Sequence, residues 1–344
     1  MSEGETILLP GTGIETTRLG FGTALLMGTV EWDDSLRLLE AAYDSGIRHF
    51  DTARLYGYGG AEQALGAFMK GRRDRVTVAT KLGLNPPVVP GGLLRAKAVT
   101  RRIVERWAPG LRARLGRGTR GMVERSFTPE SARAAFERSL AALDTDYVDI
   151  LFLHDCQPPD LEDAALTDYL LGLKEAGRVR ALGVATDLAA AASLRRSHPE
   201  IAQVVQVAAA HDDPAIAALV GNPGAPPATI THSILAERLR LVAGHLRRTD
   251  AEAAWARRLG CASLDGATLA GLLIDRAMRR NPGGVVLFST TNRERIAANV
   301  EAMSALSPSS ERDDALDRLL AEAAGDGEPT AAIPASVRAG GVAG

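Results

Sequence analysis

Short apolar strands alternate with helical patterns along most of this chain, and the alternation limits the folds open to it. Each predicted strand is apolar or rich in β-branched residues, and a segment with helical spacing follows it. This order favours a parallel sheet covered by helices. The predicted strands are residues 18–23, 49–51, 76–80, 148–154, 181–186, 204–208, 228–233 and 284–288. At 344 residues the chain has room for one large barrel or two medium domains.

Composition and charge narrow the class of protein. The formal charge is −2 and the isoelectric point is about 6.3, which argues against a nucleic-acid-binding protein or one attracted to membranes. The chain shows no secretory leader and no apolar run long enough to span a bilayer, so we expect a soluble cytoplasmic protein. Two cysteines, Cys156 and Cys261, are too few for a disulfide framework or a cysteine-based metal site. The chain also lacks a His-x-x-x-His spacing, which would have indicated a histidine-based metal site.

Polar side chains stand where several predicted strands end, which is where parallel α/β proteins place their working groups. Asp51 closes the second strand, Lys81 follows the third, His154 closes the fourth, and Tyr56 lies shortly after Asp51. Taken singly, each has an ordinary explanation as a turn cap, a solvated charge, a core histidine or a loop aromatic. Lysine is rare, however, since only four of the forty basic residues are lysines: Lys70, Lys81, Lys97 and Lys174.

The run Phe50-Asp51-Thr52-Ala53-Arg54-Leu55-Tyr56-Gly57-Tyr58-Gly59, with Lys81 and His154 at later strand ends, resembles the aldo-keto reductase superfamily. The resemblance covers roughly residues 19–302. It implies a single (β/α)8 TIM barrel over residues 1–324, with an N-terminal β-hairpin that plugs its lower end. Residues 325–344, rich in Gly, Ala and Pro, are expected to form a flexible tail.

The resemblance also assigns roles to the four side chains. Tyr56 would be the general acid/base, because a nearby cation draws the pKa of a phenol down toward neutrality. Lys81 would supply that cation, and Asp51 would keep its ammonium charged and fixed. His154 would hydrogen-bond the substrate oxygen and orient or relay the proton. A nicotinamide cofactor would carry the hydride.

Contacts to the nicotinamide half of the cofactor follow the resemblance with departures. Where the family has Ser and Asn after strand five, this chain has Ala185 and Thr186, so one hydroxyl remains. Gln206 matches the family glutamine that reaches the carboxamide. His232 replaces the tyrosine that stacks on the ring, and an imidazole stacks over less area. The residues expected here are Gly22, Thr23, Thr186, Gln206, His232 and Ser233.

The turn after strand eight matches the family segment for the adenosine 2′-phosphate and adenine. Free backbone N–H groups and the helix dipole favour anions at such a turn. The residues expected to bind there are Ser289, Thr290, Arg295 and Asn299. Arg295 favours NADP(H) over NAD(H), although the lysine often found at the position of Ser289 is absent.

Residues 82–127 interrupt the strand–helix rhythm with a Pro/Gly-rich stretch and an Arg-rich segment. An insertion after strand three opens on the active face of a barrel, so it is a candidate lid or specificity loop. Its arginines fit either a solvated basic surface or recognition of an acidic substrate.

The sequence therefore predicts an NAD(P)(H)-dependent oxidoreductase that interconverts a carbonyl, such as an aldehyde, ketone or sugar, and an alcohol. A monomer or small homo-oligomer is expected. One alternative is a family member that keeps the cofactor site but mainly binds a partner protein and turns over little. A second alternative is a barrel enzyme that uses the same four residues for non-redox chemistry, which predicts no nicotinamide binding.

Overall fold

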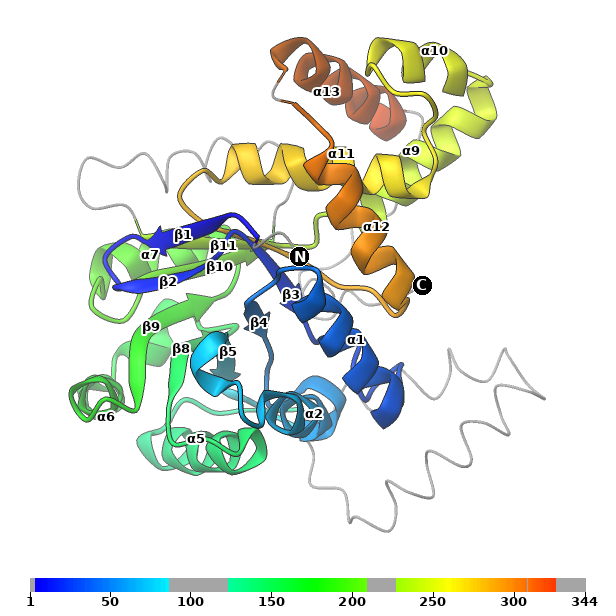
Figure 1. Cartoon of the computed structure of the whole chain (residues 1–344). Coiled ribbons are helices and arrows are strands. Elements are labelled where there is room, and N and C mark those ends of the chain that lie inside the picture. The colour runs from blue at the N-terminus through cyan, green and yellow to red at the C-terminus, as the bar shows by residue number, and fades with distance from the viewer. Residues whose placement is uncertain (1–3, 87–122, 209–226, 308, 326–344) are drawn as a thin grey trace.

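Eight parallel strands form a closed barrel in the computed structural model, which describes residues 4–86, 123–208, 227–307 and 309–325 (Figure 1). Around the barrel the strands follow the order β10, β11, β12, β3, β4, β5, β8 and β9. The prediction of a (β/α)8 barrel is confirmed. The barrel strands are β3 (Leu19–Gly22), β4 (His49–Asp51), β5 (Thr77–Leu82), β8 (Val148–His154), β9 (Val179–Ala185), β10 (Val204–Ala208), β11 (Ala228–His232) and β12 (Val285–Phe288).

Alternation along each strand sorts side chains between the barrel interior and the helices outside. In β8, Ile150 and Phe152 belong to the cluster inside the barrel, whereas Leu151 and Leu153 belong to the core under the helices. The hairpin β1 (Thr6–Leu9) and β2 (Ile14–Thr17) is antiparallel. Its Leu9 and Ile14 are fully buried against the interior cluster, as expected for a plug.

Helices surround the barrel, and several begin at a residue whose side chain caps the helix. Thr128 accepts a hydrogen bond from the Ser131 N–H at the start of the helix that contains a first-turn proline. None of the described helices is both long and apolar enough to cross a membrane. The helices are α1 (Trp32–Asp44), α2 (Gly60–Met69), α5 (Pro129–Leu143), α6 (Ala164–Glu175), α7 (Leu188–Ser197), α9 (Ala236–Thr249), α10 (Glu252–Arg258), α11 (Gly266–Arg280), α12 (Arg293–Ser304) and α13 (Ser310–Gly325).

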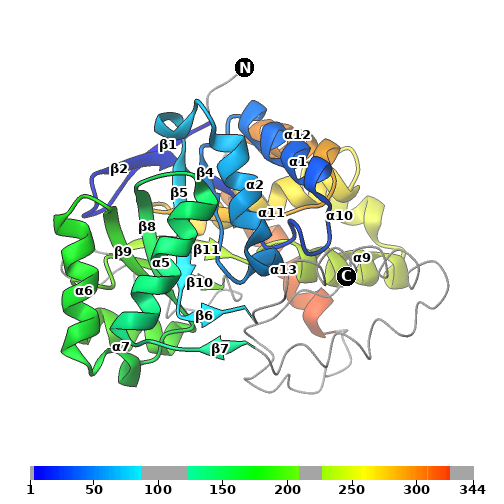
Figure 2. The ribbon, with the colours of Figure 1, turned by 90° about the horizontal axis from the view of Figure 1, so that it is seen from below.

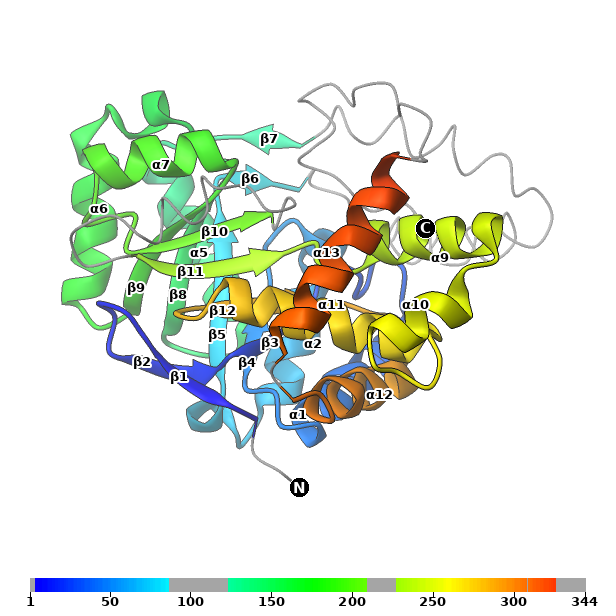
Figure 3. The same ribbon diagram turned by 90° about the horizontal axis from the view of Figure 1, so that it is seen from above.

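Helices α9, α10 and α13, with one face of α11, form a lobe with an apolar core of its own. Trp255, Leu259, Leu316 and Leu319 are buried in this core. Figures 1 and 3 show the lobe on the side of the barrel opposite α6. We call it the helical lobe.

The described ends of the predicted insertion form a short antiparallel ribbon. Its strands are β6 (Leu84–Asn85) and β7 (Glu124–Arg125), which lie side by side in Figure 2. Residues 87–122 of the predicted insertion lie outside the described residues, as do residues 326–344 of the predicted tail.

Candidate active site

An ion pair between Asp51 and Lys81 forms the centre of the candidate site. Asp51 ends β4, and Lys81 lies near the end of the adjacent strand β5. The Lys81 Nζ donates to Asp51 Oδ1 at 2.5 Å and to the Thr52 carbonyl oxygen at 2.9 Å. Burial lowers the pKa of Lys81, but the effects of Asp51 and Tyr56 raise it by more than burial lowers it. The pKa of Lys81 is therefore above its ordinary value. The ammonium is therefore held charged inside the barrel mouth.

Gln206 holds the other oxygen of the same carboxylate. Its Nε2 donates to Asp51 Oδ2 at 2.8 Å, and both side chains are almost fully buried. Strand β10 lies four places from β4 in the ring of eight, so this hydrogen bond crosses the barrel. The sequence predicts Gln206 as a carboxamide ligand, and the structure adds a bond to Asp51 that the sequence does not indicate.

Tyr56 and His154 lie above this pair. Tyr56 begins the 3-10 turn Tyr56–Gly59, and its ring lies edge-on to the His154 ring, with centroids 6.2 Å apart. The Lys81 Nζ is 5.2 Å from the Tyr56 ring centroid. The structure thus brings together all four residues of the predicted group.

The phenol and the imidazole are both electrically neutral in this environment. Burial raises the pKa of Tyr56, and the nearby Lys81 opposes that rise without reversing it. The expectation that Lys81 draws this pKa below its ordinary value is therefore wrong for the protein alone, because desolvation outweighs the cation. The pKa of His154 is lowered to about 3, first by burial and then by Lys81 and His232.

Four loops at this end of the barrel contain non-glycine residues with left-handed backbone. These residues are Met27, Tyr58, Asp155 and Ser233, one in each loop, with φ of 56°, 58°, 57° and 61°. Asp155 directly follows His154, and Ser233 directly follows His232. Such conformations are costly for residues with side chains and cluster at functional sites. Backbone strain is therefore concentrated around the candidate site.

A buried polar network lies beneath the loop that carries Tyr56. Glu62 of α2 is fully buried, accepts from the Thr80 hydroxyl at 2.8 Å and pairs with Arg54 at 3.4 Å. Thr80 adjoins Lys81, and Arg54 lies in the Tyr56 loop. Glu62 thus ties the two catalytic candidates to one helix, a role the sequence analysis missed.

The residues expected to bind the nicotinamide half lie at the same end of the barrel. Gly22 and His232 are the last residues of β3 and β11, Gln206 lies in the middle of β10, and Thr186 directly follows β9. Burial lowers the pKa of His232 to about 4, so its ring is neutral. Its Nδ1 lies 2.9 Å from the Ser233 hydroxyl oxygen.

The two threonines of this set differ in their hydrogen bonding. The Thr186 hydroxyl accepts a hydrogen bond from Gln157 Nε2 at 3.1 Å and keeps its own proton to donate. Thr23 has a fully buried hydroxyl with no hydrogen-bond partner in the described part of the chain. A carboxamide would find hydroxyl and amide partners at this end of the barrel.

The turn between β12 and α12, where the sequence predicts a phosphate site, has several backbone N–H groups bonded to its own side chains. The Ser289 hydroxyl donates to the Gly22 carbonyl oxygen at 2.8 Å, which joins β12 to β3. Asn292 caps α12 by accepting from the Glu294 and Arg295 N–H groups. The Arg295 side chain is exposed, whereas Asn299 on the next turn is buried. Thr290 is half-buried, and its hydroxyl accepts from the Asn292 N–H.

The returning strand of the ribbon is anchored at the mouth. Arg125 of β7 forms a two-pronged ion pair with Asp160, and it also donates to the Asp155 carbonyl oxygen at 3.3 Å. Asp155 directly follows His154. The insertion therefore re-enters the barrel beside the candidate catalytic group.

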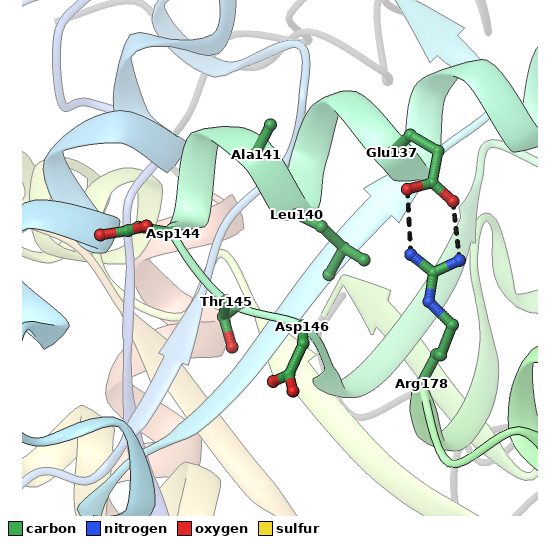
Figure 4. A pocket seen from close by; sticks show the side chains of 7 residues that line it. All are labelled: Glu137, Leu140, Ala141, Asp144, Thr145, Asp146 and Arg178. Atoms are coloured by element: carbon green, nitrogen blue, oxygen red, sulfur yellow. Dashed lines mark hydrogen bonds and ion pairs between the residues drawn. The ribbon is translucent and has the colours of Figure 1, made fainter.

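One open depression lies at the opposite end of the barrel and is unrelated to these residues. It has a volume of about 560 Å³ and is lined by Glu137, Leu140, Ala141, Asp144, Thr145, Asp146 and Arg178 (Figure 4). Residues 144–146 precede β8 and Arg178 precedes β9, so the depression lies at the amino ends of the strands. A bidentate ion pair between Glu137 and Arg178 crosses it. Catalytic residues of such barrels sit at the other end, so we assign this face a structural role.

Fold and site together define a class of protein, a (β/α)8 barrel with an Asp–Lys pair, a tyrosine and a histidine at the carboxyl ends of its strands. The model of the Aldo/keto reductase family matches residues 18–212, more than half of the chain. The chain belongs to the aldo/keto reductase family. Within the described residues, no cluster of three or more His, Cys, Asp or Glu could hold a metal ion.

Known relatives extend this result. D-threo-aldose 1-dehydrogenase of a Pseudomonas species is 32% identical over 184 residues, 50% of this chain and 50% of that protein. Pyridoxal 4-dehydrogenase of Microbacterium luteolum is 34% identical over 148 residues, 42% of this chain and 41% of that protein. The chain thus matches about half the length of these relatives or less. An aldo-keto reductase structure from Bacillus halodurans has a TM-score of 0.66 at 18% identity, over 92% of this chain and 96% of that chain, and shows likeness of fold.

Proposed function

We propose that this protein is an NAD(P)(H)-dependent oxidoreductase that interconverts a carbonyl group and an alcohol, with Tyr56 as general acid/base. The observation that carries the proposal is the buried Lys81 ammonium, held by Asp51 at 2.5 Å beside the Tyr56 phenol. Family membership supports the reaction class, and relatives named as dehydrogenases of a sugar and of pyridoxal support a sugar or small aldehyde as substrate.

The side chains divide the work of moving one proton. In reduction, the neutral Tyr56 phenol gives its proton to the substrate oxygen as the alkoxide forms, and Lys81 stabilises the phenolate left behind. The neutral His154 ring donates a hydrogen bond to the same oxygen and orients it. In oxidation the Tyr56 phenolate takes the alcohol proton. Because burial raises the pKa of Tyr56, the protonated form prevails near neutral pH, which suits reduction, and oxidation should accelerate as the pH rises.

The residues present fit a nicotinamide dinucleotide. Thr186, Gln206 and His232 would hold the nicotinamide half, together with Gly22, Thr23 and Ser233 at the ends of neighbouring strands. The β12–α12 turn with Arg295 would hold the phosphate half, and its exposed guanidinium favours NADP(H) over NAD(H). When bound, the cofactor supplies or accepts the hydride.

The experiment is carbonyl reduction and alcohol oxidation over a panel of sugars and small aldehydes, with NADPH and NADH, in wild type and Tyr56→Phe. The variant keeps the ring but lacks the transferable proton, so kcat should fall by about 10²- to 10⁴-fold. Cofactor binding, followed by fluorescence, should not change. Tyr58→Phe, two residues away, is the matched control and should retain kcat. Full turnover by Tyr56→Phe would remove Tyr56 from the mechanism.

A second function is supported by one departure from the family pattern. Strand β9 leads into Ala185-Thr186 in place of Ser-Asn, and the Thr186 hydroxyl is already bonded to Gln157. Fewer anchors for the carboxamide suit a cofactor-binding regulatory protein with little turnover. Tight cofactor binding without turnover across the whole panel would favour this function over the enzyme.

A further inference from the structure

We infer that Gln206 is a positioning residue that sets the field at Tyr56 by holding the second carboxylate oxygen of Asp51 from across the barrel. The inference deepens the proposed function and rests on it for the role of Tyr56. It differs from the carboxamide contact that the sequence predicts for Gln206, because it concerns a contact within the protein.

The geometry of the contact is specific. Asp51 points into the barrel from β4 with Oδ1 on Lys81 at 2.5 Å and Oδ2 on Gln206 Nε2 at 2.8 Å. Only the NH2 end of the amide can face a carboxylate oxygen, since two oxygens would repel. Gln206 is 2% exposed, and the side chains of Asp51 and Lys81 are 5% and 2% exposed. A charge-assisted hydrogen bond in such surroundings is stronger than a neutral one in water.

The contact matters because Asp51 and Lys81 act on Tyr56 in opposite directions. Lys81 lowers the pKa of the phenol, and Asp51 raises it. The Gln206 N–H offsets part of the carboxylate charge on Oδ2 and fixes the carboxylate so that Oδ1 faces Lys81. Without this donor, more of the Asp51 charge is felt at Tyr56 and less of the Lys81 charge.

The same amide can also serve the cofactor. The bond to Asp51 is made by Nε2, so the Oε1 atom of Gln206 takes no part in it. Oε1 can accept from an N–H of the carboxamide, so one side chain would link cofactor binding to the proton donor.

The test replaces Gln206 by Met, which keeps much of the length and removes the donor. Tyrosinate absorbance is titrated against pH in cofactor-free wild type and Gln206→Met, and in the same two proteins with Tyr56→Phe added. The difference between the curves with and without Tyr56→Phe reports the ionisation of Tyr56 alone. We expect Gln206→Met to move the titration midpoint of the Tyr56 phenol upward by about 0.5 to 1 pH unit. The alkaline limb of the pH profile of kcat, measured at saturating cofactor, should move by the same amount. The titration needs no turnover, so it remains decisive if the proposed function fails.

Two controls separate positioning from cofactor contact. Thr186→Val, directly after the neighbouring strand β9, should raise the cofactor Kd and leave the Tyr56 midpoint in place. In an Asp51→Asn background, Gln206→Met should cause no further shift, because the charge that Gln206 offsets is gone. If Gln206→Met changes only the cofactor Kd, or shifts Tyr56 equally with and without the Asp51 charge, the inference is wrong.

Discussion

At the scale of single residues, the site shows how burial and charge compete. Lys81 keeps its charge because Asp51 compensates for its desolvation. Burial lowers the pKa values of His154, His232 and His49. His232 and His49 have acidic neighbours that act in the opposite direction, but burial outweighs them. The barrel interior thus holds one paired cation and neutral imidazoles.

We expect His49 to make the stability of the protein depend on pH. It is fully buried in β4, its Nδ1 is 3.5 Å from the Thr16 hydroxyl, and burial lowers its pKa to about 4. An unfolded histidine has a pKa of about 6.5. Between these values the unfolded chain binds a proton that the folded chain excludes, so the unfolding free energy should fall as the pH falls from about 6.5 toward 4.

The full effect corresponds to roughly 3 kcal/mol. Urea unfolding of wild type and His49→Gln at several pH values checks it. The variant should lose this part of the acid dependence even if it is less stable at pH 7, and an unchanged slope with pH would count against His49.

Arg295 should determine the choice between the two nicotinamide cofactors. Its exposed guanidinium follows the β12–α12 turn, where a 2′-phosphate would lie, and bonds between charged groups contribute about 1.5 to 3 kcal/mol. Arg295→Ala should therefore raise the Kd for NADPH by about 10- to 100-fold and leave that for NADH unchanged. Fluorescence titration of both cofactors measures this, with Arg293→Ala on the same turn as control. Equal losses for both cofactors would remove the phosphate assignment.

At the scale of elements, close packing inside the barrel depends on small residues at defined positions. Gly183 of β9 faces Phe152 of β8, and a Cβ there would come within 2.5 Å of the Phe152 ring and 2.6 Å of the Val204 carbonyl oxygen. We expect Gly183→Ala to lower the free energy of unfolding by about 1 to 3 kcal/mol through overpacking.

Gly172 provides the matched comparison. It lies in α6, is exposed, and has nothing within 4 Å of the added methyl. Gly172→Ala should be neutral or stabilise the protein by up to about 1 kcal/mol, because alanine favours the helix. Denaturant unfolding measures both variants, and similar effects at the two positions would contradict the packing argument.

Elements were predictable where their signals are local. The apolar runs that became β8, β9 and β10 are recognisable in the sequence by themselves, so the sequence predicts these strands within a few residues. The four candidate catalytic residues could be named because Asp51, Lys81 and His154 stand at predicted strand ends and the run around Tyr56 resembles a family motif. The Gln206–Asp51 bond joins residues 155 positions apart, and no local pattern reports a contact made by closure of the barrel. The net rise of the Tyr56 pKa was missed for a similar reason, since it depends on burial by distant elements.

At the scale of the whole molecule, two apolar cores stand side by side. One fills and surrounds the barrel, and the other belongs to the helical lobe of α9, α10, α13 and part of α11. Ion pairs of Arg276 and Arg280 with Asp317 connect α11 to α13. Helix α11 contributes residues to both cores and joins them.

We expect the helical lobe to open independently of the barrel. Leu319 is fully buried in the lobe core, and Leu319→Ala should cost about 2 to 5 kcal/mol there. Hydrogen exchange should accelerate in α9, α10 and α13 and remain slow in β4, β5 and β8. Leu320→Ala, at a partly buried neighbour, should have a smaller effect. Uniform acceleration across the barrel strands would show that the two cores unfold as one.

The hydrogen bond from Gln206 to Asp51 also bears on how this scaffold can be re-engineered. Together with the Asp51–Lys81 ion pair, it forms a buried polar network beneath the reacting atoms. Shortening side chains there to make space for bulkier compounds would leave a buried charge without its partner. Room for new substrates should therefore be sought in the loops after β3, β4 and β8, which contain Met27, Tyr58 and Asp155, where substitutions leave this hydrogen bond intact.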